Sequence, residues 1–539
     1  MNRMMAAICA LTIAGSAQAE PYKPSADAIR AHIAFLADDA MRGREAGSPE
    51  YEIAASYVAS RFIEYGLKPA GDPGSYLQKV AMTTYVPGEG RITLAPHGGG
   101  AAVPLLFGDD YIPGGTPLSP EVKLDAPLVF AGFGVVAPGY KHDDFKRLDV
   151  KGKIVVVLAG APKWFQGEER AHYGNGTTKR LAAAARGAAG LITLYTPTRQ
   201  SVSPFERLKL NWNETAMTWT DAAGKPWFPG GSATPVATIG LAGGAKLFAG
   251  SSTSLDQVIA AAESKTPVAM PRFALPMRAS IELKSTLGQG SSSNVAGMIE
   301  GSDPTLKSEV VVLSGHLDHE GVGAAQGGDT IYNGAMDNAS GIATMLEVAH
   351  AFKHDGGRPK RSVMFLAVTA EEKGLVGADY FARNPTVPKA SIVANVNLDM
   401  PILSYDFTDI VAFGADRSTI GGAVKRAADS LGLAVTPDPD PDQGIFTRSD
   451  HYRFVQQGVP SVFLKTGPAN GGAAADKLFR STRYHRPNDD LSQPIDYAAG
   501  ARFAAVNYAI ARELADTPQR PRWNKGDFFG TQFDGFGAK

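Results

Sequence analysis

The sequence holds a single cysteine among 539 residues, and that residue, Cys9, falls within the first 19 positions. Those positions have the pattern of a secretory signal: Arg3, a short apolar stretch, and the small-x-small cleavage pattern of residues 17–19. Cleavage after Ala19 would leave a chain without thiols, which excludes disulfides, thiolate catalysis and cysteine-ligated metals. We therefore expect a periplasmic or secreted protein.

Excess charge and long apolar runs are also missing. The 53 basic residues nearly balance the 54 acidic ones, so no broad basic face for nucleic acid is expected. Beyond the signal, no run reaches the ~18 apolar residues of a membrane-spanning helix. Hydrophobic residues make up 44% of the chain and charged residues 20%, as in soluble globular proteins, and the length predicts two or three cores.

Continuous apolar strands alternate with helical patterns after residue 294. The strands are predicted at 310–314, 363–368 and 392–396, with helices at 341–352 and 375–381. Strands without polar alternation are typical of sheets buried on both faces. The pattern therefore predicts an α/β fold with a doubly wound, mostly parallel sheet and helices on both of its faces.

The central block, residues 115–275, has a different texture. It has short strands at 127–136 and 153–159, a loop-rich stretch at 196–250, and no spacing typical of metal ligands. We expect a separate, β-rich inserted domain without a catalytic role, whose loops narrow the mouth of a neighbouring site. The predicted organisation is a signal (1–19), one discontinuous domain (20–114 and 276–515), the insert (115–275) and a surface tail (516–539).

Polar residues follow each of the three buried strands. His316 and Asp318 follow the first, Glu371 and Glu372 the second, and Asp399 the third. The carboxyl ends of parallel strands meet at one edge of the sheet, where ligands bind. Imidazole and carboxylate without thiolate suit zinc or a similar divalent ion, and neighbouring carboxylates need a cation to offset their repulsion. The sequence therefore predicts a metal site at this edge.

Five blocks of sequence match, in order, the motifs of a known enzyme family. They are His316-Leu-Asp-His319, residues 332–341, Ala370-Glu-Glu372, Asn397-Leu-Asp-Met400 and Tyr484-His485-Arg-Pro487. The chain resembles the zinc aminopeptidases and exopeptidases of the M28 type, and residues 32–44 match that family as well. The central block, through residues 130–134, 149–157 and 183–190, resembles the protease-associated (PA) domain that many members carry as an insert.

The resemblance implies a role for each matched residue. Asp337 would bridge two zinc ions, with His316 and Asp399 completing one site and Glu372 and His485 the other. Glu371 would be the general base beside a metal-bridging water.

Other implied roles lie further from the metals. Asp318 would orient His316, and Tyr484 would hydrogen-bond the developing oxyanion. Arg448 and His451 lie in a segment resembling a substrate-proximal loop, and we expect His451 to line the pocket. A cis peptide bond is expected between Asp337 and Asn338.

These features favour an exported di-zinc exopeptidase that removes N-terminal residues from peptides. Two alternatives share the fold: a glutaminyl-cyclase-like acyltransferase with one zinc, and a carboxypeptidase acting on acidic dipeptides. A non-enzymatic binding ectodomain is a hypothesis of another class. Zinc content separates the hypotheses, because the peptidase requires two ions, the cyclase one and the binding module none.

Overall fold

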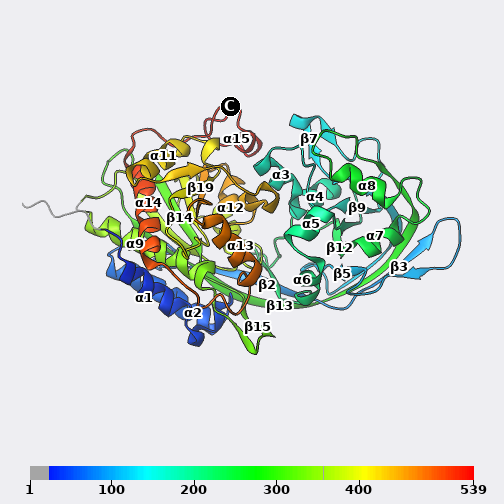
Figure 1. Cartoon of the computed structure of the whole chain (residues 1–539), viewed down its shortest axis with the longest axis horizontal. Coiled ribbons are helices and arrows are strands. Elements are labelled where there is room, and N and C mark those ends of the chain that lie inside the picture. Colours follow the sequence, from blue (N-terminus) through cyan, green and yellow to red (C-terminus); the bar gives the residue numbers. More distant parts are fainter. Residues whose placement is uncertain (1–22, 356) are drawn as a thin grey trace, which may run out of the picture.

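A computed structural model describes residues 23–355 and 357–539, so the predicted signal and Cys9 lie outside the described residues. The described chain folds into two lobes that lie side by side (Figure 1). The main lobe contains the matched motifs. The inserted lobe, which we define as residues 88–284, lies beside it. No helix of the described part is long and apolar enough to cross a bilayer.

The main lobe is built on a mixed, mostly parallel sheet, as predicted. The strands follow the order β13–β17–β14–β18–β21–β19–β20, and the four from β17 to β21 are mutually parallel. The bounds are β13 (Arg272–Ile299), β14 (Val310–His316), β17 (Ser362–Val368), β18 (Ile392–Leu398), β19 (Asp409–Phe413), β20 (Ala434–Thr436) and β21 (Ser461–Thr466).

Helices cover both faces of this sheet. On one face, Leu313 joins a core shared with α1 (Ala26–Leu36), α2 (Pro49–Glu64), α9 (Ser340–His354), α11 (Ile420–Ser430) and α14 (Tyr497–Asp516). On the other, Val312 packs with residues of α10 (Val376–Arg383) and α12 (His451–Val455). Successive strand residues point to opposite faces, and because both faces are buried, the strands are mainly apolar on both sides.

The inserted lobe has its own core and its own sheet. Its strands follow the order β3–β13–β6–β9–β10–β12–β5. Their bounds are β3 (Arg91–Pro96), β5 (Tyr111–Pro113), β6 (Glu121–Ala131), β9 (Ile154–Leu158), β10 (Gly190–Leu194) and β12 (Thr234–Ile239). The core of this lobe runs from Ile92 to Leu283, beyond both ends of the predicted 115–275 block.

The stretch 196–250 is more regular than its composition predicts. It contains helices α5 (Pro197–Val202), α6 (Phe205–Leu210) and α7 (Leu241–Leu247), and strands β11 (Ala216–Trp219) and β12. Elements of four to seven residues are too short for a periodic pattern to be recognised. The expectation of loops was therefore wrong for this stretch.

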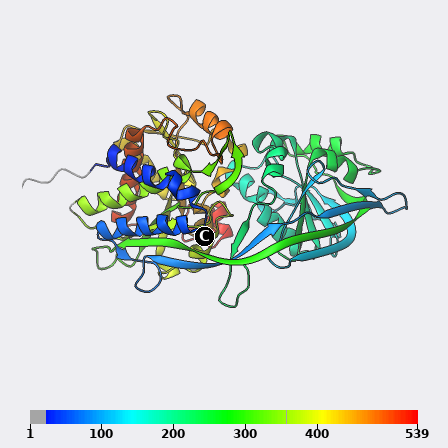
Figure 2. The same ribbon diagram turned by 90° about the horizontal axis from the view of Figure 1, so that it is seen from below.

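A single strand of 28 residues, β13, runs through both lobes. Its first part pairs with β3 and β6, its middle with β2 (Leu77–Pro87), and its end with β17. Figure 2 shows this strand and its neighbour β2 passing beneath both lobes. The two sheets therefore share continuous backbone hydrogen bonding.

The tail after residue 516 belongs to a core rather than covering a surface. Trp523 is 1% exposed and packs with Tyr452 and Phe529, which lies on α15 (Phe528–Gln532). Arg417 of the main lobe forms an ion pair with Asp527. Burying these large aromatic side chains stabilises the docking of the tail.

Candidate metal centre

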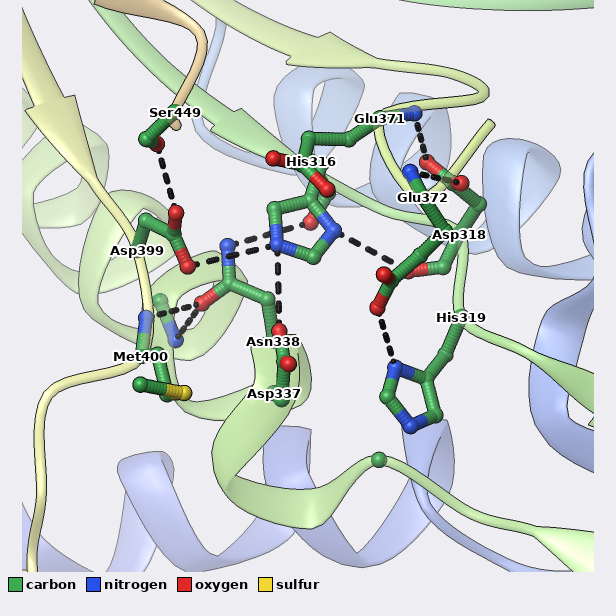
Figure 3. A network of polar contacts seen from close by, with 12 residues as sticks. His316, Asp318, His319, Asp337, Asn338, Glu371, Glu372, Asp399, Met400 and Ser449 are labelled. Carbon is green, nitrogen blue, oxygen red and sulfur yellow. Dashed lines mark hydrogen bonds and ion pairs between the residues drawn. The ribbon is translucent and has the colours of Figure 1, made fainter. Parts of the chain in front are cut away.

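The carboxyl ends of β14, β17 and β18 bring the predicted residues together at one edge of the sheet (Figure 3). His316 is the last residue of β14, and Glu371 and Glu372 come three and four residues after the end of β17. Asp399 directly follows β18. Asp337 comes from the turn before α9, and its peptide bond to Asn338 is cis, as the resemblance implies.

One set of potential ligand atoms surrounds the ring of His316. Its Nε2 lies 3.2 Å from Asp337 Oδ1 and 3.3 Å from Asp399 Oδ1. Its Nδ1 lies 3.1 Å from the backbone carbonyl oxygen of Asp318. A proton on Nδ1 donated to that carbonyl leaves the Nε2 lone pair free for a metal.

A second set surrounds His485. Its Nε2 lies 3.4 Å from Asp337 Oδ2 and 3.2 Å from Glu372 Oε2. The two carboxylate oxygens of Asp337 thus face different histidines. This is the arrangement that a bridging ligand requires.

The spacing of these atoms fits tetrahedral zinc. Nitrogen and oxygen ligands about 2.0–2.1 Å from a tetrahedral zinc are about 3.3 Å from one another. Each set has two separations of 3.2–3.4 Å. Within the described residues, every group of potential metal ligands falls in this one cluster. Histidine and carboxylate donors in this geometry fit the metal that the sequence predicts.

The carboxylate of Asp318 supports the Glu pair rather than His316. Its two oxygens accept hydrogen bonds from the backbone N–H groups of Glu371 (3.1 Å) and Glu372 (3.3 Å). His316 is instead held by the Asp318 backbone carbonyl. Asp318 therefore sets the turn after β17 that directs the two glutamates.

Further polar contacts hold the remaining ligands. Asp489 accepts from the N–H of Met336 at 3.0 Å and from that of Asp337 at 3.1 Å. The hydroxyl of Ser449 donates to Asp399 Oδ2 at 2.5 Å. Ser449 and Asp489 lie outside the five matched blocks, so matching those blocks does not reveal them.

His319, the last residue of the motif His316-Leu-Asp-His319, and Glu320 directly after it both contact residues of the cluster. Nδ1 of His319 lies 2.8 Å from Glu372 Oε1, and the side chain is fully buried. Glu320 Oε1 lies 2.9 Å from Nδ1 of His485, on the side of the ring opposite the other ligands. A carboxylate behind a metal-binding imidazole fixes its tautomer and raises its basicity.

Burial and neighbouring charges have opposite effects on the pKa values of the groups in this cluster. Burial raises the pKa of Glu371 well above its ordinary value, although the charge of His316 opposes this. Burial would lower the pKa of His485, but the charges of Glu372 and its other neighbours outweigh it and raise that pKa well above the usual range. Such perturbed groups in a pocket are typical of functional sites.

Residues of both lobes are in contact at the rim of the pocket. Arg448 Nη2 donates to the hydroxyl of Tyr484 at 3.2 Å. Arg207, on α6 of the inserted lobe, donates to the carbonyl oxygen of Tyr484 at 3.2 Å. His451 is fully buried, with its ring packed near those of Phe446 and Phe463, so its surroundings are those of a packing residue.

Residues 294–511 match the family described as "Peptidase family M28". This matched stretch contains every residue of the metal-ligand cluster. Leupeptin-inactivating enzyme 1 of Streptomyces exfoliatus is 32% identical over 235 residues, which cover 41% of this chain and 48% of that protein. A probable leucine aminopeptidase 2 of Aspergillus oryzae is 27% identical over 247 residues, which cover 43% of this chain and 46% of that one.

The chain spans about half the length of the curated relatives it matches. Among solved structures, an aminopeptidase from Aneurinibacillus sp. strain AM-1 is similar with a TM-score of 0.52 at 20% identity. The similarity covers 92% of this chain and 95% of that one. The main lobe and the inserted lobe together thus have a fold similar to that of this structure.

Proposed function

We propose that the chain is an exported di-zinc exopeptidase that removes N-terminal residues from peptides. The observation that carries the proposal is the position of Asp337, whose two oxygens face the separate sets formed by His316 with Asp399 and by His485 with Glu372. Relatives that share the M28 domain support zinc and peptide chemistry.

The metal ligands and Glu371 would have different roles in hydrolysis. When bound, zinc ions polarise the scissile carbonyl and lower the pKa of a water molecule. Glu371 lies in the pocket beside the ligands, outside the two sets centred on His316 and His485. Its raised pKa suits a general base that takes a proton from the attacking water and passes it to the leaving amine.

Tyr484 would act on the carbonyl oxygen of the substrate. Its hydroxyl oxygen accepts a hydrogen bond from Arg448, so its own proton remains for donation into the pocket. A donor held in place before reaction stabilises negative charge developing on an oxyanion. The inserted lobe, which resembles a PA domain, would limit access through the contact of Arg207 with the same tyrosine.

Two measurements test the proposal together: the zinc content of the protein and the end of the peptide from which residues are released. The purified chain beginning at Glu20 should hold two zinc ions and release p-nitroaniline from leucyl-p-nitroanilide but not from its N-acetyl derivative. One zinc with cyclisation of N-terminal glutamine would identify the cyclase alternative. Release of a C-terminal residue from an N-blocked dipeptide would identify the carboxypeptidase, and a chain without zinc the binding ectodomain.

A further inference from the structure

Two cations lie where the pocket above the metal ligands meets a larger one. Lys465 is on β21 and Arg480 is on α13 (Gly472–Thr482). Both line the small pocket that contains the metal ligands, and both also line the adjoining pocket of about 1030 Å³. Ile445 and His485 are shared by the two pockets as well, so the cations border a continuous path from the metal centre.

The two cations share one carboxylate. Arg480 Nε lies 2.8 Å from Asp476 Oδ2, whereas Lys465 Nζ lies 3.8 Å from Asp476 Oδ1, too far for a hydrogen bond. The Lys465 side chain is only 7% exposed. Burial lowers its pKa to about 8, with the charge of Arg480 adding to the effect. A buried ammonium without a close partner is costly, so an additional anion would be stabilised here.

Balancing the charge of the metal ligands does not account for Lys465. Asp337 and Asp399 both contribute to its electrostatic surroundings. Two zinc ions carry four positive charges, however, against the three carboxylates Asp337, Glu372 and Asp399. The metals would therefore neutralise these three ligand carboxylates without Lys465, whose positive charge is then available to a ligand.

We infer that Lys465 and Arg480 form a subsite for a substrate carboxylate, so that the enzyme prefers substrates with a negative charge close to the scissile bond. The inference rests on the proposed function. Two sources carry this chemistry: the acidic side chain of an N-terminal glutamate or aspartate, and the free α-carboxylate of a short peptide. Lys465 would donate to the carboxylate from the buried side and Arg480 from the side of the larger pocket.

Matched substrates separate the two sources. Glutamyl- and glutaminyl-p-nitroanilide differ only in the side-chain charge, and Leu-Ala and Leu-Ala-amide differ only in the α-carboxylate. Wild type should prefer the anionic member of one pair by about 10- to 100-fold in kcat/KM, the range of one charge-assisted hydrogen bond. The pair that shows the preference identifies the source.

Variants assign the preference to the subsite. Lys465→Met keeps the length of the side chain and should bring the ratio within the preferred pair close to one. Lys425→Met, at an exposed position on α11 outside both pockets, is the control and should keep the wild-type ratio. Arg480→Gln should lower the ratio too, and it replaces Lys465→Met if that protein does not fold. Equal kcat/KM values within both pairs in wild type would overturn the inference, as would an unchanged ratio in the variants.

A binding measurement makes the test independent of turnover. Calorimetric titration of the zinc-loaded protein with glutarate and with its monoamide should show tighter binding of glutarate by wild type, and equal binding by Lys465→Met. If leucyl-p-nitroanilide is not hydrolysed but this difference is present, the proposed function fails and the carboxylate subsite stands. If hydrolysis occurs without the difference and without a substrate preference, only the subsite fails.

Discussion

Arg207 of the inserted lobe is bonded to Tyr484, the residue directly before the metal-site histidine His485. Its Nη2 donates to the Tyr484 carbonyl oxygen at 3.2 Å, and its guanidinium carbon lies 5.4 Å from the centre of the tyrosine ring. The inserted lobe thereby holds the segment that contains His485, a proposed zinc ligand. This contact would couple access to the pocket with the geometry of the zinc site at His485.

This coupling predicts that Arg207→Ala weakens one zinc site and not the other. Loss of the hydrogen bond leaves the backbone at Tyr484 less well held, so zinc affinity at His485 should fall. We expect a decrease of up to about 10-fold, because losing a partner that contacts a ligand directly typically lowers affinity by 10-fold or more. Titration with a competing chelator measures both affinities. Arg199→Ala, at an exposed position on α5, is the control, and equal affinities in all three proteins would contradict the coupling.

Glu320 should raise zinc affinity through His485. Glu320→Gln keeps the shape of the side chain but removes the charge opposite Nδ1. We expect binding at that site to weaken about 10- to 100-fold, as for other outer-shell carboxylates. Chelator competition measures the change, with Glu282→Gln on the exposed side of β13 as the control. An unchanged affinity would mean that Glu320 does not position the histidine.

The shared position of Asp337 predicts unequal effects of removing ligands. Asp337→Ala should abolish stoichiometric zinc at both sites, because each set loses an oxygen. His485→Ala should remove mainly one zinc. Zinc per chain after dialysis distinguishes the two variants, with Asp329→Ala in the exposed hairpin as the control. Retention of two zinc ions by Asp337→Ala would disprove the bridging role.

The Glu pair predicts two separable phenotypes. Glu371→Gln should keep zinc content but lower kcat by about 10²–10⁴-fold, because the amide cannot accept the proton. Glu372→Gln should instead lower zinc affinity, since a neutral amide oxygen is a weaker ligand, and excess zinc should restore part of its activity. Kinetics with and without added zinc measure both effects. Reversed phenotypes would exchange the two roles.

His172 predicts acid sensitivity at the contact between the lobes. It lies on α3 (Gly167–Gly174), and its Nδ1 is 2.5 Å from the hydroxyl of Tyr452 on α12. Burial lowers its pKa to about 4, below the ordinary 6.5. Its contribution to stability is therefore complete above pH 6.5 and is lost as the pH falls toward 4, because the unfolded chain takes up a proton that the native state resists.

At pH 5 this loss amounts to about 2 kcal/mol. Urea unfolding at pH 7.5 and pH 5 should show a larger acid destabilisation for wild type than for His172→Gln, which keeps a hydrogen-bonding group but does not titrate. Because His451 also has a pKa lowered by burial and is present in both proteins, its contribution cancels in the comparison. Equal acid destabilisation of the two proteins would exclude His172 as the sensor.

The local pattern of the chain was enough to predict the sheet of the main lobe. The runs 310–314, 363–368 and 392–396 lie in β14, β17 and β18, because strands buried on both faces are mainly apolar. Their carboxyl ends meet at one edge, so the positions of His316, Glu372 and Asp399 followed from strand order alone. Asp337 and His485 came from the resemblance to the family motifs, and the structure brings both into the same cluster.

Other features depend on contacts between distant segments. A strand of 28 residues that serves two sheets carries no boundary in its own pattern, which is why the core of the inserted lobe extends beyond residues 115–275. The partners Glu320 with His485 and Arg207 with Tyr484 are far apart in the chain and meet only in the tertiary structure, the first pair within the main lobe and the second between the lobes. Residue type and spacing along the chain determined which side chains could bind a metal. Only tertiary packing decided which charges stand behind the ligands and which cations face the pocket, because electrostatic and hydrogen-bond energies depend on distances in space.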